Sequence, residues 1–145
     1  MRDDQDSSVP ARAAALRHMR AGLVGLALFV VLGVVLEGLH AVKAPFYLDP
    51  GSDTRRLMLR LCHAHGTLLS LVEIALGLVV RAFPRAHRRL ASFALHLAHA
   101  LIPLGFGLGA IGVRGGDPGP LVALVPAGAI ALLVAIGMTL QGLRE

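Results

Sequence analysis

Four long apolar runs separated by short polar connectors dominate the pattern of the chain. Each run reaches the roughly 20 residues that a helix needs to cross about 30 Å of hydrocarbon. In lipid such a run must be helical, because only then does every backbone N–H and C=O find a partner within its own segment. The predicted spans are residues 21–42, 58–82, 89–113 and 119–142.

This pattern predicts an all-α fold, an integral membrane four-helix bundle. Residues 20–143 form a single transmembrane domain in this interpretation. Residues 1–19 form a cytoplasmic, partly disordered N-terminal segment, in which residues 11–20 extend the first helix beyond the membrane.

The composition supports a membrane protein. Of 145 residues, 55% are hydrophobic and only 16% are charged, whereas a soluble domain carries about a quarter charged residues. The apolar content excludes a disordered chain. The single cysteine, Cys62, excludes a disulfide scaffold, and we expect it to be a small buried packing residue.

The placement of the basic residues predicts an orientation. They lie in the flanks and connectors and form no basic tract with interleaved aromatics, so the net charge of +5 does not indicate nucleic acid. Arginines are more frequent before residue 21 and over 81–89 than in the other connectors. The positive-inside rule therefore places both termini in the cytoplasm, in a bacterial inner membrane. The expected partners are the lipid bilayer and, through faces rich in small residues, further copies or a larger membrane complex.

Ionisable residues inside the predicted spans are the candidates for chemistry, because each is costly in hydrocarbon unless it meets a partner, a ligand or water. Histidines on facing helices suit haem iron or a transition metal such as Cu, Fe or Zn. The candidate cofactor and metal ligands are His63, His65, His96 and His99. The candidate hydrogen-bonding partners of those ligands, or proton carriers, are Glu37, His40 and Glu73.

Helical geometry indicates which of these candidates share a helix face. His96 and His99 are three residues apart and share a face. His63 and His65 point about 160° apart, so they cannot both bind one ion from an unbroken helix. His18 and His87 lie in basic flanks and are expected to be solvated. The alternative for the whole set is packing, with each side chain hydrogen-bonding across the bundle.

The segment His63-Ala-His-Gly-Thr-Leu-Leu69 and the following span with His96, His99 and Pro103 resemble a known family. Residues 60–112 are similar to small membrane proteins related to subunit I of haem–copper oxidases and nitric oxide reductases. The resemblance implies haem or copper ligation by His63, His65, His96 and His99 in a respiratory or nitric-oxide-related setting. The chain has four spans rather than the twelve of that core, and it has no adjacent His-His pair.

The sequence thus predicts a membrane protein that binds haem or a transition metal, with electron transfer or a respiratory accessory role as the leading function. One alternative is a small transporter or proton-relay channel subunit that uses Glu73 and the histidines. Another is a structural or assembly protein with no cofactor. No catalytic residue is predicted, and enzyme status is left open, leaning against an enzyme.

Overall fold

The computed structural model describes the backbone of residues 2–144 and the side chains of residues 9–51 and 53–144. Four long helices account for most of it: α1 (Arg2–Ala41), α3 (Asp53–Ala82), α4 (Arg89–Ile111) and α5 (Leu124–Arg144). A one-turn helix, α2 (Pro45–Leu48), and three 3₁₀ turns, η1 (Pro50–Ser52), η2 (Pro84–Ala86) and η3 (Pro120–Ala123), lie in the connectors. No strand element is present in residues 2–144, so the all-α prediction is confirmed.

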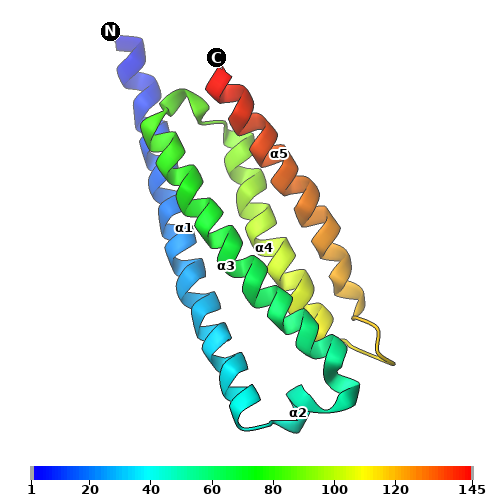
Figure 1. The fold of residues 1–145 in the computed structure, drawn as a ribbon. Coiled ribbons are helices and arrows are strands. Elements are labelled where there is room, and N and C mark those ends of the chain that lie inside the picture. Colours follow the sequence, from blue (N-terminus) through cyan, green and yellow to red (C-terminus); the bar gives the residue numbers. More distant parts are fainter. Residues whose placement is uncertain (1, 145) are drawn as a thin grey trace.

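The long helices run up and down as neighbours in chain order (Figure 1). α3 packs between α1 and α4, and α5 packs against the other side of α4. Both termini and η2 lie at one end of the bundle, which we call the terminal end, and α2 lies at the opposite end (Figure 1).

All four long helices are long and apolar enough to cross a membrane, over Val9–Ala41, Asp53–Ala82, Arg89–Ile111 and Pro120–Arg144. The first of these helices includes residues 9–20, which carry Arg12, Arg17 and Arg20 and precede the apolar run. Large apolar side chains such as Leu23, Val31 and Leu133 point outward. An outward apolar surface is what a helix bundle presents to lipid.

Glycines allow the helices to approach closely. A Cβ on Gly22 of α1 would lie 2.5 Å from the Ser70 carbonyl oxygen of α3. A Cβ on Gly105 of α4 would lie 2.8 Å from Cγ2 of Val125 on α5. Small residues at helix interfaces are the usual means of association in lipid, where burial of apolar surface supplies little driving force. Gly22 and Gly105 therefore lie at sites of close helix packing.

Candidate metal centre

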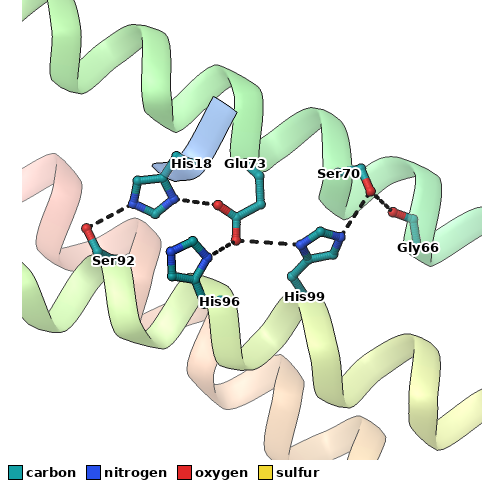
Figure 2. Close-up of polar contacts among 7 residues, drawn as sticks. All are labelled: His18, Gly66, Ser70, Glu73, Ser92, His96 and His99. Carbon is teal, nitrogen blue, oxygen red and sulfur yellow. Dashed lines mark hydrogen bonds and ion pairs between the residues drawn. The ribbon is translucent and has the colours of Figure 1, made fainter. Parts of the chain in front are cut away.

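Glu73, on α3, lies at the centre of a polar cluster that joins three helices (Figure 2). Its Oε2 lies 2.5 Å from Nδ1 of His18 on α1. Its Oε1 lies 2.8 Å from Nδ1 of His96 and 3.6 Å from Nδ1 of His99, both on α4. The Glu73 and His18 side chains are completely enclosed. Three imidazoles therefore present the same ring nitrogen, Nδ1, to one carboxylate. We call Glu73, His18, His96 and His99 the Glu73 cluster.

Two serines hold the outer edges of these rings. His18 Nε2 lies 2.9 Å from Ser92 Oγ, and His99 Nε2 lies 3.0 Å from Ser70 Oγ. The His18 and His96 rings stack with their centroids 4.5 Å apart. These contacts fix the orientation of the imidazoles, as the outer partners of metal-binding histidines do.

Local sequence explains why the rings converge. His96 and His99 are separated by three residues, so both face α3 from one side of α4. α1 approaches α3 through Gly22, and a Cβ on Gly25 would lie 2.7 Å from Nε2 of His99. The His99 ring therefore occupies the space that a side chain at position 25 would fill.

The hydrogen bonds of Ser70 bear on which ring nitrogen of His99 carries a hydrogen atom. The Ser70 hydroxyl donates its one hydrogen to the carbonyl of Gly66 at 2.7 Å. In that arrangement its contact with His99 Nε2 is a bond that Nε2–H donates. A neutral His99 consequently turns the lone pair of Nδ1 toward Glu73 Oε1, 3.6 Å away. Two facing lone pairs in an enclosed site are unfavourable, and a cation between them, either a metal ion or a proton, would remove this repulsion.

The cluster has the spacing of a metal site. The ligand atoms offered by His18, Glu73 and His96 all lie within 4.8 Å of one another. Two atoms bound at about 2.1 Å to a tetrahedral ion are about 3.4 Å apart, close to the 3.6 Å between His99 Nδ1 and Glu73 Oε1. The His18 and His96 contacts would have to lengthen by about 1 Å or less to admit an ion.

The prediction that His18 is solvated is wrong: its side chain is 0% exposed. α1 continues as a helix through the basic flank and carries His18 between α3 and α4. A sequence signal exists, because His18, Gly22, Gly25 and Phe29 are spaced by four, three and four residues and so form one helix face. That face is the one that packs on α3.

His87 is also less exposed than expected. It is half-buried in the connector before α4, and its Nδ1 is buried without a hydrogen-bond partner among the described residues. Burial, followed by the neighbouring charge of Arg17, lowers the pKa of His87. His87 and Arg17 line a groove of about 390 Å³ that reaches Ser92 and the partly exposed edge of His96. The groove thus gives the cluster access to the terminal end.

His63 and His65 lie elsewhere on α3. They precede Glu73 by ten and eight residues, roughly 15 and 12 Å along the helix axis. His63 Nδ1 donates to the Phe29 carbonyl of α1 at 2.7 Å. His65 Nδ1 donates to the carbonyl of Leu61, one turn earlier in its own helix, at 3.0 Å, and its ring lies against Phe106 of α4. The two rings face different helices, as their spacing predicted, and neither joins the Glu73 cluster.

Glu37 and His40 also lie away from the cluster. They are near the far end of α1, about 28 Å or more from His18 along the helix, and both are exposed. Of the predicted site residues, the structure therefore brings together Glu73, His96 and His99 and adds His18. Cys62 is buried and free, as expected of a packing residue.

Comparisons of the chain with protein-family models, with curated proteins and with solved structures found no match. The resemblance of residues 60–112 to haem–copper oxidase subunit I therefore stays a prediction. The functional interpretation depends on the site itself and on the four apolar helices that carry it.

Proposed function

We propose that the chain is a membrane protein that binds one first-row transition-metal ion at the Glu73 cluster. The observation that carries this proposal is the convergence of three imidazole Nδ1 atoms on one enclosed carboxylate. An anionic carboxylate and neutral imidazoles are the ligand set that Zn²⁺, Cu²⁺ and Fe²⁺ accept. The positive ion would also remove the repulsion between the facing lone pairs of His99 Nδ1 and Glu73 Oε1.

The outer hydrogen bonds support metal binding. In metal sites the second ring nitrogen of a ligand histidine commonly donates a hydrogen bond, which fixes the tautomer and turns the unprotonated nitrogen toward the ion. Ser70 accepts such a bond from His99 Nε2. Ser92 is in position to do the same for His18.

The packing favours a bare ion over haem at this place. The His18 and His96 rings are stacked 4.5 Å apart, and His99 contacts Ser70 of the facing helix at 3.0 Å. A porphyrin between these rings would have to separate α1, α3 and α4, which are joined here by direct side-chain contacts. A single ion requires only small movements.

The surroundings suggest how the site exchanges with water. The His96 side chain is 39% exposed, whereas Glu73 is fully enclosed, so the cluster opens on the His96 side. The groove there contains Arg17 and Arg89, whose positive charge favours small anions over cations inside it. With the positive-inside orientation, this opening faces the cytoplasm.

A redox-active ion at the cluster would suit electron transfer; Zn²⁺ would make the site structural.

A second candidate is proton storage. Hydrogen bonds join Ser92, His18 and Glu73, an ion-pair contact joins Glu73 to His99, and a hydrogen bond joins His99 to Ser70, so that the chain of contacts links α1, α3 and α4 (Figure 2). If no metal binds, a proton between His99 and Glu73 would take the place of the metal ion. The cluster would then serve as the proton-carrying element of a small transporter or channel subunit.

Metal binding is tested by dialysing the purified, chelator-treated protein in detergent separately against Zn²⁺, Cu²⁺ and Fe²⁺, with metal content then measured per chain. We expect one ion per chain in the wild type and at least a tenfold loss of affinity in His96→Ala and Glu73→Gln. His40→Ala and His65→Ala are the matched controls, because both histidines lie outside the cluster.

Two results would contradict metal binding. One is the absence of any tightly bound ion, which would favour proton storage. The other is an ion that the His65→Ala variant loses and the His96→Ala variant keeps. A visible spectrum of protein expressed with haem available tests haem in parallel: a Soret band that persists in His96→Ala would place haem away from the cluster.

A further inference from the structure

A second polar site lies at the end of the bundle opposite the termini. It is a groove of about 500 Å³ between α1, α2 and α3. Its polar lining consists of Glu37, His40, Tyr47, Arg60 and His63, and its apolar wall includes Val30 and Val34. Both valines are more than half exposed, so the groove is open toward the surface that the bundle presents to lipid. The groove and the Glu73 cluster share no residue.

Two opposite charges in this groove have no partner among the residues that the structure describes. Glu37 and Arg60 are exposed, and neither makes an ion pair or a side-chain hydrogen bond with any residue that the structure describes. Glu37 is four residues from the last residue of α1, and Arg60 is seven residues after Asp53, the first residue of α3. These offsets correspond to about 6 and 10 Å along the helix axes. With these helix ends at the membrane surface, both charges would lie near the level where hydrocarbon gives way to headgroups.

His63 adds an acceptor to the same groove. Its Nδ1–H donates to the Phe29 carbonyl, so a neutral His63 carries its lone pair on Nε2. A Cβ on Gly33 would lie 2.6 Å from His63 Cε1, so glycine at position 33 makes room for the His63 ring. The groove thus offers two acceptors, the Glu37 carboxylate and His63 Nε2, beside one cation, Arg60.

We propose that this groove binds the headgroup of a phospholipid that carries a primary ammonium beside its phosphate, as phosphatidylethanolamine does. The ammonium has three N–H donors for Glu37 and His63. The phosphate accepts from the Arg60 guanidinium. The acyl chains run along Val30 and Val34 into the bilayer. A zwitterion satisfies both unpaired charges at once, which a purely anionic or apolar ligand does not. The proposal is independent of metal binding.

Lipid binding by the full-length protein in detergent micelles tests this proposal, with native mass spectrometry as the readout. The two probes are phosphatidylethanolamine and phosphatidylcholine of identical acyl chains, because the quaternary ammonium of the latter has no N–H to donate. We expect one phosphatidylethanolamine per chain, bound about tenfold more tightly than phosphatidylcholine. Glu37→Gln should abolish this preference, and Arg60→Gln should weaken the binding of both lipids.

Controls at the same end of the bundle are Asp117→Asn and Arg114→Gln, two exposed charges in the connector before α5 that lie outside the groove. Neither should alter the preference. Equal binding of the two lipids would overturn the proposal, as would a preference that survives Glu37→Gln. Tight binding of phosphatidylglycerol that Glu37→Gln does not affect would show an anion site at Arg60 alone, and would also overturn it. Soluble phosphoethanolamine should not compete at concentrations where the lipid binds.

Discussion

Replacing Glu73 by glutamine should destabilise the bundle even without metal. The carboxylate accepts from His18 on one oxygen and from His96 on the other, with His99 3.6 Å from the second oxygen. Glutamine is nearly isosteric, but it keeps one accepting oxygen and brings an NH₂ group in place of the other. That group can only donate, so it would meet the donating ring nitrogen of either His18 or His96.

The expected loss of unfolding free energy lies between two typical values. Interhelical hydrogen bonds in membrane proteins average about 0.6 kcal/mol each, so the two hydrogen bonds of Glu73 give a lower scale of about 1 kcal/mol. Removing one partner of a buried charged pair costs about 3–5 kcal/mol. Because Glu73 is fully enclosed but His96 is 39% exposed, we expect about 2–4 kcal/mol, between the two scales.

Unfolding in mixed micelles by increasing the fraction of sodium dodecyl sulfate, followed by circular dichroism in the presence of a chelator, measures this loss. Glu37→Gln is the matched control: the same substitution at an exposed residue should change the free energy of unfolding by no more than about 0.5 kcal/mol. Equal stability of Glu73→Gln and Glu37→Gln would refute the conclusion that Glu73 organises the bundle.

Three further substitutions address the surroundings of the cluster. Gly25→Ala should displace the His99 ring and lower metal affinity at least tenfold, as measured by competition with a chromophoric chelator, because the new Cβ would lie 2.7 Å from Nε2. Ser70→Ala removes the acceptor of the His99 Nε2–H bond and should lower metal affinity by about 10- to 100-fold in the same assay. His87 has a lowered pKa in the folded protein, so its neutral form stabilises the fold above the ordinary value near 6.5. This contribution is lost as the pH falls below that value, and His87→Asn should flatten the decline of the melting temperature between pH 7 and 5.

Matched variants separate these effects from general damage. Gly38 lies on the same helix as Gly25, but a Cβ there would have nothing within 4 Å, so Gly38→Ala should leave metal affinity unchanged. Thr139 donates to the carbonyl of Ala135, one turn earlier in α5, and Thr139→Ala is the control for Ser70→Ala. The Gly25 and Ser70 predictions fail if these controls lose as much affinity as the test variants. For His87, an unchanged slope of melting temperature against pH would contradict its assigned role.

The sequence was sufficient to predict the fold because a bilayer permits few solutions. Apolar runs of this length must be helices. Polar residues at a spacing of three, such as His96 and His99, must share a face. The element order, the packing role of the glycines and the divergence of His63 and His65 all follow from these constraints.

The sequence was less informative about the site, because contacts between helices depend on how far each helix is shifted along its axis relative to its neighbours. His18 precedes the apolar core of the first run, and its charged neighbours Arg17 and Arg20 suggested solvent. In the structure α1 continues as a helix past this flank, and its glycine face brings His18 to the level of Glu73. The family resemblance singled out His63 and His65 by local sequence, but their depth on α3 separates them from Glu73.

X-ray absorption spectroscopy at the metal edge, on protein loaded with one equivalent of the preferred ion, tests the central claim most directly. Metal binding by the Glu73 cluster predicts nitrogen and oxygen ligands near 2.0–2.1 Å, with the multiple scattering of imidazole rings that falls in amplitude in His96→Ala. An ion with a shell of water ligands, or a spectrum identical in the wild type and His96→Ala, would contradict it.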